Sequence, residues 1–319
     1  MASVSPIRAS SGGGARSRLA AWAALALLAA SGACSPGRDP AKEQARLIAA
    51  AGTPQSGEEL AWAVAGGWRL DPARDAFRHP AETLTFFGLR PGMHVVEIYP
   101  GRGWYTDILA PYTAKTGGAF TAAVLPGEEA AASELAQQYA ARLEARAGLY
   151  GPVRTTPFGP ANLSLGPDAS ADLVVTFRNV HSLMAAGFVE DAFAAFYRVL
   201  KPGGALGVVE HRASASGLQD PQASDGYVQE EYVKRLAQEA GFTFEGASSV
   251  NANPKDTRNH PFGVWTLPPV LRTAPLGQPP NPGFDTAPYR AIGESDRMTL
   301  LFRKPMPGPP APAPSTDAR

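Results

Sequence analysis

The chain has 319 residues, of which 44% are hydrophobic, so it can bury a sizeable core in one large domain or two small ones. Lysine plus arginine and aspartate plus glutamate number 29 each, which leaves no net charge. A chain without net charge has no general attraction for a polyanion, and we expect no nucleic-acid partner.

The first 34 residues have the order of an export signal. Arg8, Arg16 and Arg18 precede an uncharged run over residues 19–30, and small residues follow as far as Cys34. A basic segment, a short apolar core and small residues are typical of a signal peptide. Because the apolar core is short for a permanent membrane span, we expect the signal to be removed.

Cys34 is the single cysteine of the chain, so it has no disulfide partner within it. The segment that ends at Cys34 resembles a bacterial lipoprotein signal, in which the cysteine becomes the lipidated first residue. The resemblance implies lipidation of Cys34 and a location on the periplasmic face of a bacterial membrane. Ser31 stands where such signals usually have leucine. Ordinary cleavage and a retained signal segment therefore remain as alternatives.

The rest of the chain divides by composition. Residues 35–57 are polar and rich in alanine, which predicts a linker. Residues 58–304 carry the helix-like and strand-like patterns of a domain, and residues 305–319 form a proline-rich segment that predicts a disordered tail. Within the domain, Pro72 and Pro80 divide the helical pattern before residue 88 into at least two helices.

Strand-like and helix-like segments alternate through the middle of the domain, which predicts a doubly wound, mostly parallel α/β sheet with helices on both faces. About 45 residues without clear periodicity precede the last strand, and a loop of that length is either functional or disordered. The expected strands cover 93–99, 119–124, 152–156, 171–177, 204–210, 242–250 and 297–303, and the main helices cover 103–113, 128–147, 184–199 and 227–240.

A glycine turn follows the first strand. Glu97 is the one acid in that strand, and Gly101 and Gly103 follow it just before a helix begins. Open α/β sheets bind ligands at the carboxyl ends of their strands, and glycines let a ligand lie against the backbone. The helix start also offers free N–H groups. We therefore expect a ligand site beside Gly101 and Gly103.

The segment 95–105 resembles the first motif of the class I S-adenosylmethionine-dependent methyltransferases, and Leu200-Lys-Pro-Gly-Gly204 resembles the turn before their fifth strand. The resemblance implies a Rossmann-like sheet with an antiparallel last strand, and S-adenosylmethionine as the cofactor, organised by Glu97. Tyr99 replaces the first glycine of the motif. Its side chain either narrows the cofactor pocket or packs outward.

The segment 171–183 resembles the fourth strand and following loop of the same family, where the cofactor and acceptor pocket is lined. This implies that Asn179 contacts the cofactor and that His181 lies at the pocket mouth. Glu210 and His211 end the next strand. A neutral histidine can accept a proton from the methyl acceptor while a carboxylate orients it, so His181 and His211 are candidate bases with Glu210. The alternative for each is an ordinary loop or strand-end residue.

Two functions are consistent with these residues. The first is a methyltransferase that acts on a small-molecule acceptor, in line with a resemblance to a bacterial group of exported, predicted methyltransferases. The second is an exported, non-catalytic ligand-binding protein on the same scaffold. The five histidines show no ligand spacing, so we expect no metal site.

Overall fold

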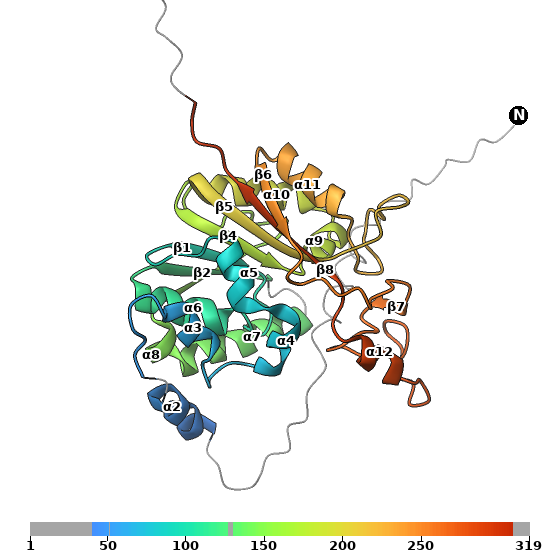
Figure 1. Ribbon diagram of the computed structural model, residues 1–319, viewed down its shortest axis with the longest axis horizontal. Helices are drawn as coiled ribbons and strands as arrows, with labels where there is room; N and C mark the ends of the chain where they lie inside the picture. The colour runs from blue at the N-terminus through green and yellow to red at the C-terminus, as the bar shows by residue number, and fades with distance from the viewer. Residues whose placement is uncertain (1–39, 51, 127–129, 309–319) are drawn as a thin grey trace, which may run out of the picture.

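The computed structural model describes residues 40–50, 52–126 and 130–308, and its centre is a seven-stranded sheet in the order β3-β2-β1-β4-β5-β8-β6 (Figure 1). The order of the strands reverses between β1 and β4, which are neighbours in the sheet: β2 and β3 follow β1 toward one edge, and β5 follows β4 toward the other. The strands are β1 (His94–Ile98), β2 (Ala119–Val124), β3 (Val153–Pro157), β4 (Ala171–Phe177), β5 (Leu200–His211), β6 (Thr243–Ser248) and β8 (Arg297–Arg303).

Strand direction confirms the predicted fold class. The strands from β1 to β5 pair in parallel, and β8 runs antiparallel to both of its neighbours, β5 and β6. β4 and β8 consist almost entirely of buried residues, as expected for strands covered on both faces. The structure is therefore a doubly wound, mostly parallel α/β sheet with an antiparallel last strand.

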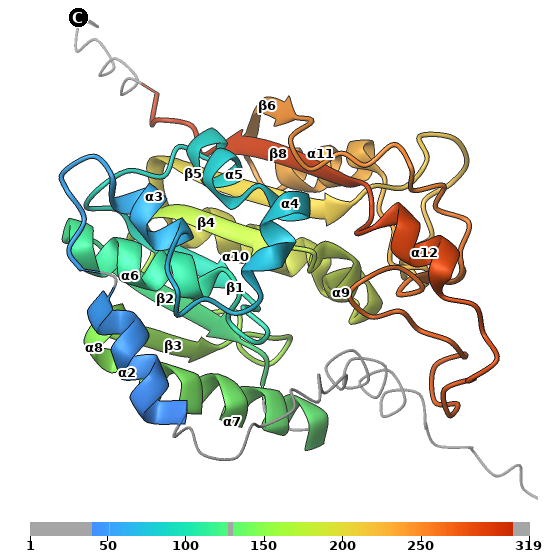
Figure 2. The same cartoon turned by 60° about the horizontal axis from the view of Figure 1, so that its bottom comes forward.

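Helices cover both faces of this sheet, as Figure 2 shows. One face packs against α9, α10 and α11, and the other against α3, α5, α6 and part of α7, each through its own hydrophobic cluster. Their bounds are α3 (Glu59–Val64), α5 (Pro80–Phe86), α6 (Thr106–Thr116), α7 (Ala130–Ala145), α9 (Val180–Ala185), α10 (Val189–Val199) and α11 (Glu230–Glu239). Shorter elements are η1 (Pro72–Arg74), α4 (Asp75–Arg78), α8 (Ala147–Tyr150), β7 (Pro261–Val264) and α12 (Ala287–Ile292).

Two elements differ from the sequence expectation. The helix expected over residues 184–199 is two helices, α9 and α10, because the chain turns at Gly187 with a φ of 73°. Within the expected linker, Pro40–Ala50 forms helix α2, and Gln44 accepts a hydrogen bond of 2.9 Å from Arg146. Cys34, the rest of the expected signal and most of the expected tail lie outside the described residues. No helix among the described residues is long and apolar enough to span a membrane.

Asp107, fully buried in the first turn of α6, anchors the segments around the glycine turn. Its carboxylate accepts hydrogen bonds from the backbone N–H of Leu70 at 2.6 Å, from Arg142 Nε at 2.9 Å and from the Tyr150 hydroxyl. Its backbone oxygen accepts a hydrogen bond from Trp68 Nε1 at 2.8 Å. One side chain therefore holds the segment before β1, α7 and α8 against the same helix.

The long segment between β6 and β8 lies at the carboxyl ends of the parallel strands. Buried Asn251 donates to Thr83 and Thr299, both at 2.9 Å, and Asn253 donates to the backbone oxygen of Glu294 at 2.7 Å. Trp265, from the middle of this segment, lines the cavity described next. The segment without sequence periodicity is therefore part of the end of the sheet that contains the cavity.

Candidate functional site

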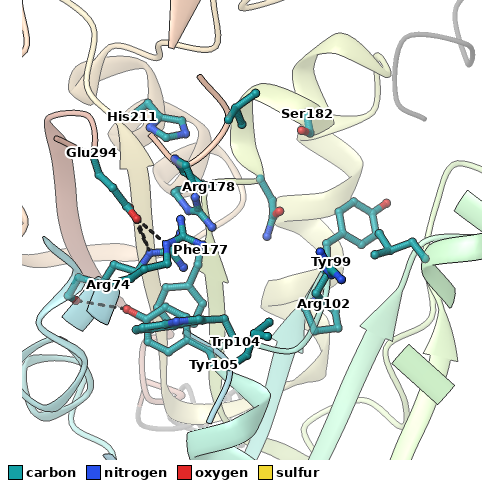
Figure 3. Close-up of a pocket in the computed structure, with 18 of the residues that line it drawn as sticks. Arg74, Tyr99, Arg102, Trp104, Tyr105, Phe177, Arg178, Ser182, His211 and Glu294 are labelled. Carbon is teal, nitrogen blue, oxygen red and sulfur yellow. Dashed lines mark hydrogen bonds and ion pairs between the residues drawn. The ribbon is translucent and has the colours of Figure 1, made fainter. Parts of the chain in front are cut away.

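A cavity of about 750 Å³ lies where β1 and β4 end, at the point where the strand order reverses (Figure 3). This is the position at which open α/β sheets bind ligands, and the volume is in the range of small-molecule sites. Its wall includes Glu97, Tyr99, Gly101, Asn179, His181 and His211 from the sequence prediction. Six predicted site residues from three strand ends thus face one cavity.

The glycine turn contributes its backbone to this wall. Gly101 has a φ of 58°, in the left-handed region, and a Cβ placed on it would meet no atom within 4 Å. The space beside Gly101 is therefore open to a ligand. Gly103 has a different position: a Cβ there would come within 3.1 Å of Arg142 and 3.3 Å of Tyr139, so this glycine allows α7 to approach the turn.

Glu97 is buried on the cavity wall, with 2% of its surface exposed. Its Oε2 accepts a hydrogen bond of 2.7 Å from Thr106 Oγ1. Burial raises the pKa of Glu97 to about 8, an effect that Thr106 opposes and the charge of Asp107 reinforces. Without a ligand this side chain is therefore mostly protonated near neutral pH, and a nearby cation would favour its ionised form.

Tyr99 packs against the protein while one side of it lines the cavity. Its hydroxyl donates a hydrogen bond of 2.8 Å to the backbone oxygen of Phe158, and the two ring centroids are 5.9 Å apart. Its φ is 47°, a left-handed conformation that costs a non-glycine residue about 1–2 kcal/mol. The position is thus one where glycine is unstrained, and the buried ring compensates for the strain in this chain.

Asn179 connects the ends of two strands. Its Nδ2 donates to the backbone oxygen of Ile98 at 2.8 Å and to Thr176 Oγ1 at 3.2 Å, which joins the end of β1 to β4. None of the described residues donates a hydrogen bond to its side-chain oxygen. Asn179 therefore positions the strand ends, and its oxygen is the atom available to a ligand.

His181 and Glu210 form a buried pair. His181 Nδ1 lies 3.0 Å from Glu210 Oε1, and the backbone N–H groups of His181 and His211 donate to the same carboxylate at 3.2 and 2.8 Å. With a carboxylate beside Nδ1, the neutral imidazole carries its proton there and presents a lone pair at Nε2. This Nε2 is buried and has no hydrogen-bond partner among the described residues. His181 can thus accept a proton from a ligand in the cavity.

His211 has a supporting position beside this pair. Its Nδ1 lies 2.5 Å from Ser295 Oγ, and its ring centroid is 5.4 Å from that of His181. Burial holds the pKa of His211 well below its usual value, and the neighbouring His181 and three arginines lower it further. His211 is therefore neutral across the physiological pH range.

Sequence spacing had indicated no metal site, yet the fold brings one possible ligand atom from each of His181, Glu210 and His211 within 4.8 Å of one another. Glu210 already accepts hydrogen bonds from two backbone N–H groups and faces the ring of His181, and Ser295 occupies Nδ1 of His211. Protein contacts thus satisfy most of this donor set. The geometry favours a histidine–carboxylate pair, and the absence of a metal site stays a prediction.

The sequence interpretation missed the aromatic and cationic part of the wall. Tyr105 stacks on Phe177 with ring centroids 3.5 Å apart, and the Arg78 guanidinium lies 4.7 Å from the centroid of Trp104. Glu294 reaches the same wall from the long segment before β8. Aromatic residues directly after the glycine turn were a visible signal for Trp104 and Tyr105. No local pattern indicated that Glu294 would meet them.

Comparison with known proteins finds no matching protein-family model and no matching curated protein. Among solved structures, the chain is similar to a SAM-dependent methyltransferase from Aquifex aeolicus, at 20% identity over 57% of this chain and 88% of that chain, with a TM-score of 0.46. It is also similar to the 1,6-didemethyltoxoflavin-N1-methyltransferase of Burkholderia thailandensis with bound 1,6-didemethyltoxoflavin and S-adenosylhomocysteine, at 15% identity over 85% and 93% of the two chains, with a TM-score of 0.41. A third similar structure is the cyclase SpnF, at 18% identity over 75% and 84%, with a TM-score of 0.49.

Proposed function

We propose that this chain binds S-adenosylmethionine beside the glycine turn and transfers its methyl group to a small-molecule acceptor. One observation carries the proposal: a single cavity contains both the open turn at Gly101 with buried Glu97 and a histidine, His181, whose Nε2 is free. The resemblance of residues 95–105 and 171–183 to class I methyltransferase motifs supports the same reading.

The residues around the turn fit the cofactor chemically. Gly101 leaves room for a ligand against the backbone, and Leu125 and Leu135 provide apolar surface beside it. Glu97 is able to change from a neutral acid to a carboxylate, which suits a ligand that carries positive charge. When bound, S-adenosylmethionine supplies a methyl group whose bond to a sulfonium breaks with the electron pair remaining on sulfur.

The residues of this chain then handle the acceptor and its proton. An acceptor hydroxyl or amine placed against His181 transfers its proton to Nε2 as its lone pair forms the bond to the methyl carbon. Glu210 faces Nδ1 at 3.0 Å and stabilises the imidazolium that results.

The direct test is calorimetric titration of S-adenosylhomocysteine into the full chain. We expect one site per chain, weakened by Gly101→Ala, since the new methyl group occupies the open space beside the turn. Gly88→Ala is the matched control, because Gly88 has a φ of 75°, a Cβ added to it would also meet no atom within 4 Å, and it does not line the cavity. Absence of binding at millimolar ligand, or equal binding by both variants, contradicts the assignment of the cofactor site.

We propose further that the protein is exported, as in the bacterial group that it resembles, and anchored by a lipid on Cys34, as the resemblance of its first 34 residues to a lipoprotein signal implies. Metabolic labelling with a radioactive fatty acid tests this, with Cys34→Ser as the control that should lose both the label and the membrane fraction. A protein found in the periplasm with an unrelated copurified metabolite, identified by mass spectrometry, would favour the alternative of a non-catalytic binding protein.

A further inference from the structure

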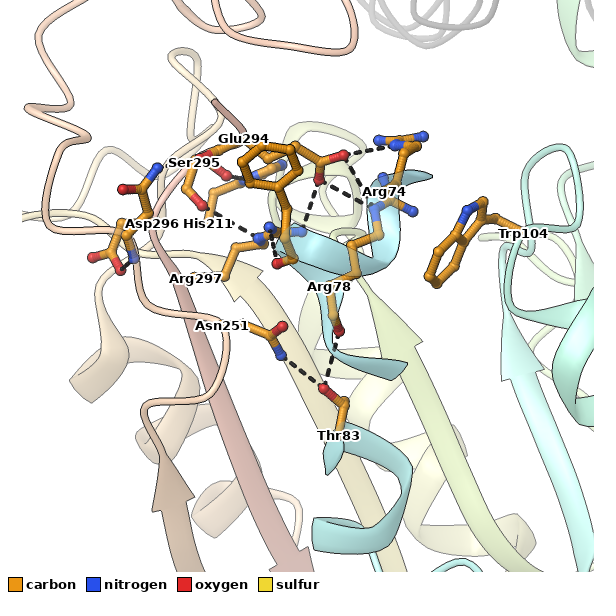
Figure 4. A network of polar contacts seen from close by, with 12 residues as sticks. Arg74, Arg78, Thr83, Trp104, His211, Asn251, Glu294, Ser295, Asp296 and Arg297 are labelled. Atoms are coloured by element: carbon orange, nitrogen blue, oxygen red, sulfur yellow. Dashed lines mark hydrogen bonds and ion pairs between the residues drawn. The ribbon is translucent and has the colours of Figure 1, made fainter. Parts of the chain in front are cut away.

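Arg74, Arg78 and Arg297 converge on the carboxylate of Glu294, near Trp104 (Figure 4). Glu294 accepts from Arg74 Nε at 2.6 Å, from Arg78 Nε at 3.1 Å and from Arg297 Nη1 at 2.9 Å. The positive charge of Arg178 also acts on Glu294. Together the four guanidinium groups hold the pKa of Glu294 far below its usual value, so it is ionised.

This cluster has more charge than the protein neutralises. Arg78 and Arg297 make no ion pair with any other carboxylate among the described residues, and Arg74 has only half-exposed Asp71 at 4.0 Å in addition. Within the cluster itself, four cations face one anion. Positive charge that is largely buried and only partly neutralised is unfavourable, so this surplus favours an anion that completes the site.

Arg178 is the member of the cluster with no partner. Its guanidinium makes no hydrogen bond or ion pair within the described part of the chain, although it lines the cavity directly after β4. Its backbone has a φ of 63°, a left-handed conformation that is unfavourable for arginine. Burial and the charge of Arg74 lower the pKa of Arg178 to about 10, which leaves it charged at neutral pH.

Two other arginines have donors to spare. Arg74 Nη2 and Arg78 Nη2 are buried and have no hydrogen-bond partner among the described residues. Guanidinium groups bind carboxylates and phosphates through paired N–H donors. Figure 3 shows Arg74, Arg178 and Glu294 on one side of the cavity and Tyr99 and Arg102 on the other. The guanidinium groups of Arg74 and Arg178 are thus across the cavity from Tyr99.

We propose that the methyl acceptor is an anion, whose carboxylate or phosphate binds Arg178 together with Arg74 and Arg78 while its nucleophilic atom faces His181. That this anion is the methyl acceptor, with its nucleophilic atom facing His181, rests on the proposed function. The buried rings of Trp104, Tyr105 and Phe177 line the same cavity, so apolar surface lies beside the arginines. The class of acceptor is therefore a carboxylic acid or phosphate monoester with an apolar body.

The carboxylate of S-adenosylmethionine is a second possible source of the anion. One carboxylate neutralises a single charge, whereas the four arginines keep two positive charges in excess of Glu294 and half-exposed Asp71. We therefore assign an anionic acceptor in addition to the cofactor. Titrations with and without the cofactor product separate the two sources.

The experiment uses benzoate and phenyl phosphate as anionic probes and benzamide as their neutral counterpart, titrated at low salt into the full chain saturated with S-adenosylhomocysteine. We expect both anions to bind at least about tenfold more tightly than benzamide, as befits charge-assisted contacts. Arg178→Gln should weaken the binding of both anions by about tenfold and leave the affinity for benzamide unchanged. Because the Arg178 side chain makes no hydrogen bond or ion pair with the described residues and is repelled by neighbouring arginines, this variant should melt at the wild-type temperature or higher.

Arg90→Gln is the matched control, since Arg90 is exposed, does not line the cavity and should leave all three affinities unchanged. Equal binding of benzoate and benzamide, or an Arg178→Gln variant that binds anions normally, overturns the proposal. Anion binding that disappears when S-adenosylhomocysteine is present also overturns it, because the cluster then serves the carboxylate of the cofactor. If anions bind but S-adenosylhomocysteine does not, the anion site stands and only the assigned cofactor fails.

Discussion

The Nδ1 atom of His181 lies 3.0 Å from the Oε1 atom of Glu210, although 29 positions separate the two residues in the chain. His181 lies in the first turn of α9, shortly after β4, and Glu210 lies near the end of β5. The pairing of these two parallel strands therefore brings the two residues together. Two backbone N–H groups hold the carboxylate in place. The contact determines which nitrogen of the imidazole is available to a ligand.

The tautomer of His181 is the first prediction. We expect the neutral ring to carry its proton on Nδ1, since the carboxylate of Glu210 favours it there. Nitrogen-15 NMR of the histidine side chains measures this directly. Glu210→Gln should lower the Nδ1–H population and, with any acceptor that is turned over, reduce the rate about 10²–10⁴-fold without changing affinity for S-adenosylhomocysteine. A wild-type ring protonated on Nε2 would contradict the assigned role of His181.

The contribution of Glu97 to the free energy of unfolding should depend on pH. Burial raises its pKa to about 8 from an ordinary value near 4.5, so between these values the folded protein keeps a proton that the unfolded chain releases. Unfolding then releases a proton, and the contribution of Glu97 to the free energy of unfolding is present below about pH 4.5 and is lost as pH rises to about 8. In urea titrations from pH 5 to pH 9, Glu97→Gln should gain stability relative to wild type up to about pH 8 and then level off. A constant difference would mean that Glu97 is ionised in the folded protein.

Two substitutions of Tyr99 should lower the free energy of unfolding by different amounts. Tyr99→Phe leaves the buried oxygen of Phe158 without its donor and should lower the free energy of unfolding by about 1 kcal/mol. Tyr99→Gly relieves about 1–2 kcal/mol of left-handed strain but loses a buried ring worth about 3–5 kcal/mol, so it should be less stable by about 2 kcal/mol. Chemical denaturation measures both. Tyr112→Phe is the control, since no described residue accepts a hydrogen bond from its hydroxyl; a stabilised Tyr99→Gly would show that strain outweighs packing.

Asp107 is predicted to be the most sensitive polar residue near the turn. Asp107→Asn keeps the size of the side chain but leaves partly buried Arg142 without its counter-charge. Loss of one partner of a buried ion pair costs about 3–5 kcal/mol, and urea denaturation should show a loss of this order. Asp168→Asn, at an exposed aspartate, should change stability by less than about 0.5 kcal/mol. Similar small effects at both positions would exclude Asp107 as the anchor of α7 and α8.

Local patterns predicted most of the sheet. The strands expected over 119–124, 171–177 and 297–303 have those bounds in the structure, because runs of β-branched and aromatic residues report burial in a sheet directly. β5 begins at Leu200, four residues earlier than expected, since Leu200 pairs with Ala171 and the Lys-Pro-Gly-Gly segment forms an irregularity before regular pairing starts at Ala205. The positions of Glu97 and Gly101 at the cavity followed from the strand and glycine-turn pattern, and that of Asn179 from the resemblance of residues 171–183 to a methyltransferase strand and loop.

The sequence by itself therefore determined the fold class and the end of the sheet that contains the cavity, because residue periodicity and turn glycines act over a few neighbouring positions. The tertiary structure alone decided what the cavity contains. Glu294 meets Arg74 across 220 positions of the chain, and Ser295 meets His211 across 84. Contacts between such distant segments depend on how strands and loops assemble in space, and no local pattern encodes them.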